Sequence, residues 1–374
     1  MISPEDYYDH LKSEDINFFT GVPDSLLKDF CFYISDKSKN HIIAANEGNA
    51  LSLAIGYHIS TEKISAVYLQ NSGLGNLINP LLSLADKDVY SIPILLIIGW
   101  RGNPNEKDEP QHKKQGRVML EMLNSMEIPF EVLKKNDNTS KIKLKTSKII
   151  KNITRNNAPA AIIVEKGVFD SYPYKNLLKN KYKLSRNEAM RILLKKIPKK
   201  SIIVSTTGFT SRELFEYRKE NPGIRNSDFL TVGGMGHANQ IAAGIALHNK
   251  KHVYCFDGDG AVIMHMGSLA INGSLNIINL KHIVFNNGSH ESVGGQPTVG
   301  HRISIKDIAK NCGYKLTLKA ETSQQIQKAI QKIRDFNGSA LLEIMVSNNT
   351  KSDLSRPDKS PCDNKLELMS FLKE

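Results

Sequence analysis

The chain has 374 residues, which predicts two or three domains, each large enough to bury a core of its own. Its composition is that of an ordinary globular protein, and its formal net charge is +12 at pH 7. Because the excess lysine is scattered over helices and turns, without an arginine-aromatic stripe or a nucleic-acid motif, a solvated basic surface is favoured and a nucleic-acid partner is not expected.

The first half alternates apolar strands with helix-like stretches. Strands are predicted at residues 18–20, 42–45, 65–69, 94–98, 130–133 and 161–164. This alternation predicts an α/β fold with a parallel, doubly wound sheet. The periodicity then fades between residues 167 and 184, which makes this stretch the best linker.

The second half repeats the alternation without a residue-level repeat. Its strands are predicted at residues 202–205, 229–232, 253–256, 283–285, 315–318 and 341–346. We therefore expect two doubly wound parallel-sheet domains, 1–178 and 179–374. From Ser347 a polar tail with Pro357 and Pro361 predicts an irregular surface segment before a short apolar end.

Cysteine usage and the N-terminus bear on the compartment. The four cysteines lack Cys-x-x-Cys spacing, so neither a zinc site nor a disulfide framework is predicted. The N-terminal residues have no apolar signal core, and the longest apolar run, 92–100, is too short to cross a membrane. These features predict a cytoplasmic protein without a membrane partner.

The most informative stretch is residues 252–288. One apolar run breaks into Gly258-Asp259-Gly260, and a second breaks into Asn286-Asn287-Gly288. In a right-handed β-α-β unit the carboxyl ends of both strands lie side by side, so these polar groups would face one crevice. Carboxylate and amide oxygens suit Mg²⁺, which fills its other positions with phosphate oxygens. The stretch predicts a metal-bridged diphosphate, although Gly-Asp-Gly alone also occurs in ordinary turns.

Gly-Asp-Gly followed by residues 261–285 and Asn-Asn resembles the signature of thiamine diphosphate-dependent enzymes. The resemblance implies thiamine diphosphate and Mg²⁺ as cofactors. It implies Asp259, Asn287 and the backbone carbonyl of Ser289 as metal ligands, with Gly258, Gly260 and Ala261 in the cofactor turn. Asp257 is expected to orient that turn.

Glu47 lies where the strand 42–45 passes into a helix. The helix dipole alone favours a glutamate there, so a capping role is the alternative to catalysis. The resemblance implies that Glu47 hydrogen-bonds N1′ of the aminopyrimidine and so helps N4′ to remove the C2 proton of the thiazolium. Because Glu47 and Asp259 lie in different domains, it also implies a homo-oligomer with active sites at subunit interfaces.

Two further loops follow strands of the second half. Thr206, Thr207 and Gly208 open a helix whose amides favour phosphate, although a plain helix cap explains them equally well. The Gly233–Gly236 loop lacks the Rossmann spacing. The resemblance implies that the Gly233 carbonyl meets N4′ and that Met235 props the cofactor in its bent conformation; a plain core role for Met235 is the alternative.

Longer stretches narrow the resemblance to the phosphonopyruvate decarboxylase family, over residues 1–346. They are TGVPDSLL (20–27), NEGNA (46–50), QNSGLGN (70–76), GWRG (99–102), DEPQH (108–112) and GSHESVGGQPT (288–298). Many thiamine decarboxylases carry a middle domain, for which this chain has no room. The resemblance implies a carboxy-lyase that converts 3-phosphonopyruvate to phosphonoacetaldehyde and carbon dioxide, in phosphonate biosynthesis, for example toward 2-aminoethylphosphonate.

Such an anionic substrate needs cationic donors, and Arg101, His112, Lys113, Lys114 and Arg117 follow the strand 94–98. Arginine holds a phosphonate bidentately. We expect Arg101 and His112 to bind the substrate, with Asp24 and Ser25 closing the pocket or only capping a turn. His112 is also the expected proton donor after carbon dioxide leaves, and His290 is its rival; an orienting role stays open for both.

Three alternatives remain. A sulfopyruvate decarboxylase, or a related 2-oxo acid decarboxylase, acts on a similar substrate; sulfonate is almost isosteric with phosphonate but carries less charge. A basic nucleic-acid-binding protein is disfavoured by the scattered lysines. A catalytically dead cofactor-binding subunit is disfavoured because Glu47, Asp259 and Asn287 are all present.

Overall fold

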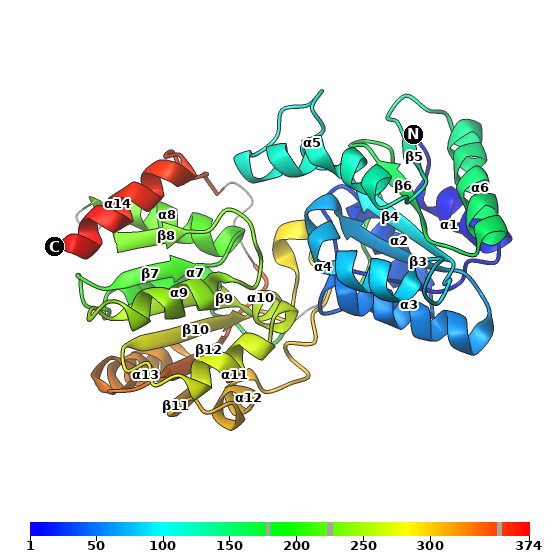
Figure 1. The fold of residues 1–374 in the computed structure, drawn as a ribbon. Coiled ribbons are helices and arrows are strands. Elements are labelled where there is room, and N and C mark those ends of the chain that lie inside the picture. The colour runs from blue at the N-terminus through cyan, green and yellow to red at the C-terminus, as the bar shows by residue number, and fades with distance from the viewer. Residues whose placement is uncertain (177–179, 223–226, 350–353) are drawn as a thin grey trace. The chain divides into compact units, whose positions relative to one another are not determined.

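The computed structural model describes residues 1–176, 180–222, 227–349 and 354–374 (Figure 1). The chain divides into two compact units, Met1–Leu177 and Leu178–Glu374. The predicted domain boundary between residues 178 and 179 lies outside the described residues and stays a prediction. In the described part of the chain, no helix combines the length and the apolar character needed to span a membrane. All four cysteines are free.

Unit 1 is a parallel sheet with helices on both faces (Figure 1). Its strands are β1 (Phe19–Gly21), β2 (His41–Ile43), β3 (Ser65–Gln70), β4 (Ile94–Gly99), β5 (Phe130–Leu133) and β6 (Ala160–Val164). Its helices are α1 (Pro4–Ser13), α2 (Lys28–Lys37), α3 (Glu47–Thr61), α4 (Leu74–Pro80), α5 (Pro110–Ser125) and α6 (Thr139–Asn156).

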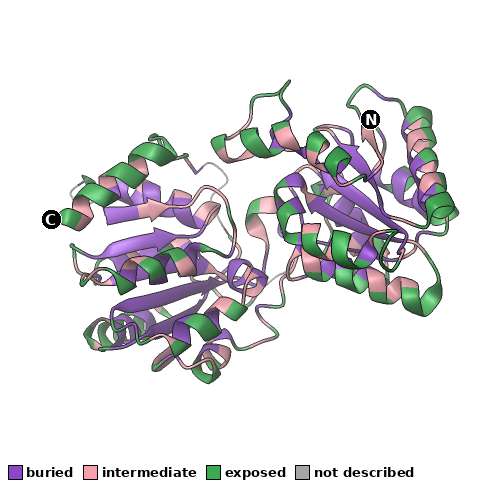
Figure 2. Cartoon of the chain, in the orientation of Figure 1, coloured by how far each residue is buried: buried purple, intermediate pink, exposed green. Residues whose placement is uncertain are grey.

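The strands of unit 1 are buried on both sides, because successive side chains point to opposite faces. In β4, Leu95 and Ile97 join the core that contains α1, α2 and α6, whereas Leu96 and Ile98 join the core of α3, α4 and α5. Figure 2 shows the result as buried strands beneath helices with exposed outer faces. The continuous apolar run at residues 92–100 therefore marks a central strand.

Unit 2 has the same architecture. Its strands are β7 (Ile202–Ser205), β8 (Asp228–Leu230), β9 (Val253–Gly258), β10 (Leu280–Asn286), β11 (Leu316–Ala320) and β12 (Ala340–Met345). Its helices are α7 (Arg186–Leu194), α8 (Phe209–Glu220), α9 (Ala238–Leu247), α10 (Asp259–Met264), α11 (Gly267–Ser274), α12 (Ile305–Asn311), α13 (Ser323–Asp335) and α14 (Pro361–Lys373).

The two sheets have the same strand order. Within the described residues it is β2-β1-β3-β4-β6-β5 in unit 1 and, read in the matching direction, β8-β7-β9-β10-β12-β11 in unit 2. In each unit the second strand lies on one side of the first strand, and the third strand lies on its other side. This reversal opens a crevice at the carboxyl ends of β1 and β3, and of β7 and β9, where doubly wound sheets bind ligands.

The predicted doubly wound fold is confirmed, and each predicted strand has a counterpart shifted by a few residues at most. The predicted irregular segment is confirmed for residues 347–349 and 354–360, but the prediction missed the helix that follows and wrongly counted Pro361 with the irregular part. Residues 361–373 form the helix α14, because Pro361 starts the helix and Ser360 caps it by accepting a hydrogen bond from the Asp363 amide. Sequence reasoning treated this proline as an irregularity rather than as a helix start.

Candidate active site

One pocket in unit 2, with about 480 Å³ of empty space, collects most of the predicted cofactor and metal residues. It lies at the carboxyl ends of β7, β9 and β10, which is the predicted crevice. The predicted residues that line it are Thr206, Thr207, Met235, Gly258, Asp259, Gly260, Ala261, Asn287, Ser289 and His290. Gly208 and Gly233 lie beside it, at the N-cap of α8 and in the loop after β8.

Asp259 is the buried carboxylate of this pocket. It begins α10 directly after β9, and Thr298 donates a hydrogen bond to its Oδ2. Burial raises the pKa of Asp259 to about 6, and hydrogen bonds, including one from the Asn287 backbone, oppose that shift. A buried carboxylate of this kind is stabilised by a cation.

Asn287 and Ser289 complete an oxygen-rich donor set. The Asn287 amide is anchored at both ends, since its Oδ1 accepts from the Ser289 amide at 3.0 Å and its Nδ2 donates to Glu291 at 3.1 Å. The Ser289 hydroxyl is buried and, among the described residues, has no hydrogen-bond partner. Carboxylate, amide and carbonyl oxygens are hard ligands, so the residues present fit Mg²⁺.

The start of α8 fits the phosphate groups of a cofactor. Gly208 takes a φ of +89°, and the first turn of the described helix is not capped by a side chain. The Thr206 amide donates to the Phe256 carbonyl at 2.8 Å, so Thr206 offers its side chain instead. The orphan amides of such a helix end favour an anion.

Sequence reasoning missed several residues of the pocket. They are Arg186, Phe209, Thr210, Phe285, Glu291 and Ser292. Glu291 and Ser292 belong to the GSHESVGGQPT motif, which was a signal for them. Arg186 comes from α7, far away in sequence, and had no such signal.

His290 packs against the cofactor turn, and a side chain at Gly260 would crowd its ring. Burial lowers the pKa of His290 to about 4, so its imidazole is neutral at pH 7. Asp257 does not face the pocket; it is buried, accepts from the Gly258 amide at 3.1 Å and contacts His282 at 3.3 Å. That arrangement agrees with the expected role of Asp257 in orienting the turn.

In unit 1, Glu47 occupies the first position of α3, after the cap Asn46. It is buried, its Oε2 accepts from Asn76 at 2.7 Å, and burial raises the pKa of its carboxyl. A Cβ at Gly73 would collide with Oε1, so this glycine makes room for the carboxylate. Gly73 and Asn76 both come from the QNSGLGN motif, which therefore serves Glu47. A carboxyl held in this way fits the ring nitrogen of an aminopyrimidine.

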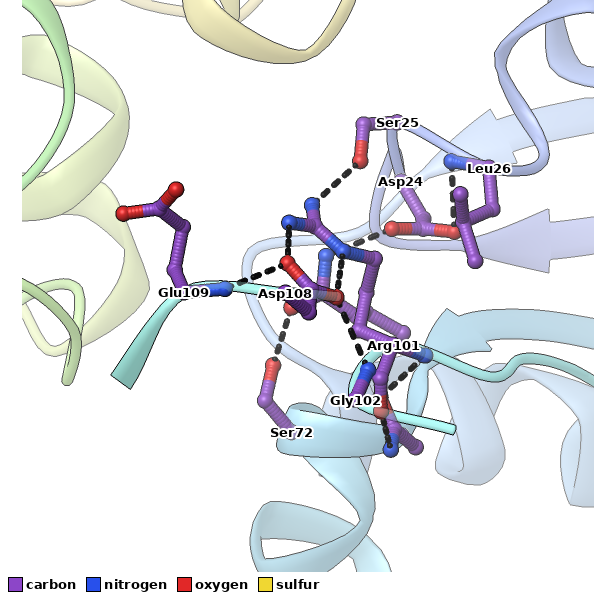
Figure 3. A network of polar contacts seen from close by, with 10 residues as sticks. Asp24, Ser25, Leu26, Ser72, Arg101, Gly102, Asp108 and Glu109 are labelled. Carbon is purple, nitrogen blue, oxygen red and sulfur yellow. Dashed lines mark hydrogen bonds and ion pairs between the residues drawn. The ribbon is translucent and has the colours of Figure 1, made fainter. Parts of the chain in front are cut away.

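Asp24, Ser25 and Arg101 form a polar network at the carboxyl ends of β1, β3 and β4 (Figure 3). Asp24 is buried and accepts from the Gln70 side chain and from two backbone amides. Arg101 donates to Ser25 at 2.9 Å and binds Asp108 bidentately at 2.7 and 2.5 Å. Its charge is thus balanced within the protein, a partnership that sequence reasoning missed.

His112 lies next to this network, in the first turn of α5. Its Nδ1 is buried and has no hydrogen-bond partner among the described residues. Burial, with the nearby charge of Arg101, lowers the pKa of His112 to about 4. The neighbouring cations Lys113, Lys114 and Arg117 are exposed on the same helix.

Comparison with known proteins adds independent findings. Two family descriptions match: "Thiamine pyrophosphate enzyme, N-terminal TPP binding domain" over residues 5–127 and "Thiamine pyrophosphate enzyme, C-terminal TPP binding domain" over residues 206–344. The first match spans Glu47 and the network of Arg101, and the second spans the pocket from Thr206 to Ser292. Each match thus falls on one of the two units.

Full-length relatives are also found. A phosphonopyruvate decarboxylase of Streptomyces viridochromogenes is 30% identical over 379 residues, covering 97% of this chain and 93% of its own length. One from Streptomyces hygroscopicus is 30% identical over 377 residues, covering 96% and 92%. A sulfopyruvate decarboxylase of Methanosarcina acetivorans is 24% identical over 370 residues, covering 92% of each.

Proposed function

Because this chain belongs to the phosphonopyruvate decarboxylase family of thiamine pyrophosphate enzymes, we propose that it converts 3-phosphonopyruvate to phosphonoacetaldehyde and carbon dioxide with thiamine diphosphate and Mg²⁺. The observation that carries the proposal is that two relatives, 30% identical over almost their whole length, are named phosphonopyruvate decarboxylases. In agreement with it, the chain has Glu47 in one unit and the Asp259 pocket in the other.

When bound, thiamine diphosphate supplies a nucleophilic carbon for the ketone and accepts the electrons of the bond that breaks. Glu47, whose carboxyl pKa is raised by burial, would hydrogen-bond N1′ of the aminopyrimidine. Asp259, Asn287 and the Ser289 carbonyl would hold Mg²⁺. The start of α8, with Thr206, Thr207 and Gly208, would hold the diphosphate, and the glycine turn of Gly258, Gly260 and Ala261 would let the backbone approach it.

The Gly233 carbonyl would accept a hydrogen bond from N4′, and Met235, which lines the pocket, would support the bent conformation of the cofactor that the family resemblance implies. Both roles agree with the position of their loop directly after β8, next to the start of α8 at the same edge of the sheet.

The substrate loses its carboxylate as carbon dioxide and gains one proton at the same carbon, whereas the carbon-phosphorus bond stays intact. Arg101 and Ser25 offer donors to the phosphonate. Because Asp108 already balances Arg101, the exposed Lys113, Lys114 and Arg117 supply the remaining positive charge. Asp24, whose carboxyl pKa is raised by burial, shapes the turn that presents Ser25.

His112 and His290 are the candidates for delivering the proton. The pKa of each is lowered to about 4, so at pH 7 each acts as a neutral N–H donor or as an orienting group. His112 remains the preferred donor because its Nδ1 is buried without a partner in the described structure.

Two wider features belong to the same proposal. We infer a homo-oligomer with active sites at subunit interfaces, as the family resemblance implies. We also place the reaction in phosphonate biosynthesis in the cytoplasm, since phosphonoacetaldehyde retains the carbon-phosphorus bond and the cysteines are free.

Sulfopyruvate decarboxylation is the second candidate, supported by the Methanosarcina relative. The test compares kcat/KM for aldehyde release from 3-phosphonopyruvate, sulfopyruvate and pyruvate. We expect phosphonopyruvate to exceed pyruvate by about a hundredfold or more, because a site built for a charged group rejects an analogue that lacks it. A higher kcat/KM for sulfopyruvate than for phosphonopyruvate would overturn the substrate assignment.

A further inference from the structure

A network of largely buried charged side chains supports the Asn287 amide. Arg186, at the first position of α7, binds Glu213 of α8 with two hydrogen bonds, at 2.8 and 3.1 Å. From its Nη1, Arg186 also donates a hydrogen bond to Glu291 Oε2 at 3.2 Å. The side chains of Arg186 and Glu213 are only 9% and 3% exposed, so this ion pair is held rigidly in the protein.

Glu291 passes this constraint to Asn287. The same oxygen, Oε2, accepts the Asn287 Nδ2–H at 3.1 Å. Arg186 therefore fixes the carboxylate, and the carboxylate fixes the amide nitrogen. Because Glu291 follows Asn287 closely in a loop without long regular structure, the anchor comes from α7 and α8 rather than from the loop itself.

The two partners of the amide demand the same orientation. A carboxylate only accepts hydrogen bonds and a backbone N–H only donates them, so Asn287 must place Nδ2 at Glu291 and Oδ1 at Ser289. A flipped amide would set N–H against N–H and oxygen against carboxylate. One lone pair of Oδ1 takes the Ser289 amide, and the other remains for a cation.

We propose that Glu291, anchored by the Arg186–Glu213 ion pair, is a positioning residue that keeps the oxygen of the Asn287 amide, and not its NH₂ group, directed at the bound cation. The inference rests on the proposed function, because it takes Asp259 and Asn287 as the Mg²⁺ ligands. An amide nitrogen carries no available lone pair, so a flipped Asn287 loses the cation. Groups that orient a ligand in this way set metal affinity.

Two substitutions at one position separate orientation from charge. Glu291→Asp keeps the negative charge but withdraws the acceptor from Asn287 by one methylene group. Glu291→Gln removes the charge but keeps an acceptor, because Arg186 donates to the side-chain oxygen and so holds it beside Nδ2. If the orientation of Asn287 matters, Glu291→Asp should weaken cation binding more than Glu291→Gln does. If the charge of Glu291 matters, Glu291→Gln should weaken it more.

The readout is direct binding of Mn²⁺, a substitute for Mg²⁺, followed by the electron paramagnetic resonance signal of the free ion in the presence of thiamine diphosphate. We expect Glu291→Asp to weaken Mn²⁺ binding by about tenfold or more and Glu291→Gln to weaken it less. Thermal unfolding midpoints without ligand establish that both variants are folded.

A double-mutant cycle with Asn287→Asp gives the sharper control. The carboxylate of Asn287→Asp presents an oxygen in either orientation, so Glu291→Asp should change the Mn²⁺ affinity little in that background. Three results would overturn the inference: wild-type affinity in Glu291→Asp, a larger loss in Glu291→Gln than in Glu291→Asp, or equal losses in both backgrounds. A wild-type protein that binds no Mn²⁺ with thiamine diphosphate overturns the proposed function, and the inference with it.

Discussion

At the scale of single residues, Glu47 shows how the motifs work together. The sequence marks Glu47 by its place after a strand, and the structure adds its support: Gly73 leaves the space and Asn76 donates the hydrogen bond. This support was not predictable, because QNSGLGN begins at the end of β3, which β1 separates from β2 in the sheet, and only folding brings it to Glu47.

Glu47→Gln tests the proton-sharing role. We expect kcat to fall by about 10²–10⁴-fold, because the amide cannot exchange a proton with the pyrimidine nitrogen, while the chain still folds around the same shape. Steady-state kinetics and thiamine diphosphate binding measured by calorimetry check this, with the exposed Glu121→Gln as the matched control. An unchanged kcat would make Glu47 a helix cap only and would revive the inactive-subunit alternative.

Arg101 illustrates what residue-level reasoning could not reach. The sequence predicted a cationic substrate donor, and Arg101 does lie at the carboxyl end of β4 beside Ser25. Its bidentate partner Asp108 lies beside it (Figure 3) and belongs to the DEPQH motif, but the pairing depends on how the loop between the two residues folds. The positions of charged residues along the sequence do not reveal this pairing.

His41 gives a pH prediction. Its Nε2 lies 2.8 Å from the Tyr68 hydroxyl, and burial lowers its pKa to about 4 from the ordinary 6.5. Between pH 6.5 and 4, His41 is therefore neutral in the folded protein but protonated in the unfolded chain. The free energy of unfolding falls as the pH drops from 6.5 through 4. The contribution of this group is about 1.4 kcal/mol per pH unit in that window.

The measurement is the free energy of unfolding in urea between pH 7 and pH 4.5. We expect His41→Gln to flatten the acid-side loss relative to wild type, whereas His248→Gln, at an exposed position, keeps the wild-type slope. Identical slopes for wild type and His41→Gln would contradict the buried neutral state of His41.

At the scale of elements, the strands were predictable and the last helix was not. Buried parallel strands consist of continuous apolar residues, so they can be recognised in the sequence. The helix α14 has an N-cap, Ser360, and a proline at its first position, but few of its apolar residues are buried. Its role depends on tertiary contacts: Asn364 accepts from the Leu230 amide and donates to the Asp228 carbonyl, which satisfies backbone groups of the edge strand β8.

Two leucines of α14 test whether the helix belongs to the core of unit 2. Leu368 is 4% exposed and joins a core cluster, whereas Leu366 is 53% exposed. We expect Leu368→Ala to lower the free energy of unfolding by about 2–5 kcal/mol and Leu366→Ala to change it by about 0.5 kcal/mol or less. Chemical denaturation of both variants measures the difference, and equal effects would mean that α14 does not pack as described.

At the scale of the whole molecule, one strand order occurs in both units. In each, polar residues follow strands at or near the reversal point: Asp24 after β1 and, two strands along, Arg101 after β4 in unit 1, and Thr206 after β7 and Asp259 after β9 in unit 2. Sequence periodicity predicted two similar sheets, and the Gly-Asp-Gly and Asn-Asn turns predicted residues that the structure brings together in one pocket. The anchors behind those residues, Arg186 above all, escaped prediction because they come from distant helices.

The most direct test of the account is aldehyde release from 3-phosphonopyruvate by protein stripped of cofactor. Thiamine diphosphate and Mg²⁺ are returned separately and together. We expect turnover only with both, because in the proposed function the Asp259 pocket would hold the diphosphate through the cation and Glu47 would act only on a bound aminopyrimidine. Turnover without either addition, or binding of both without any aldehyde, would contradict it.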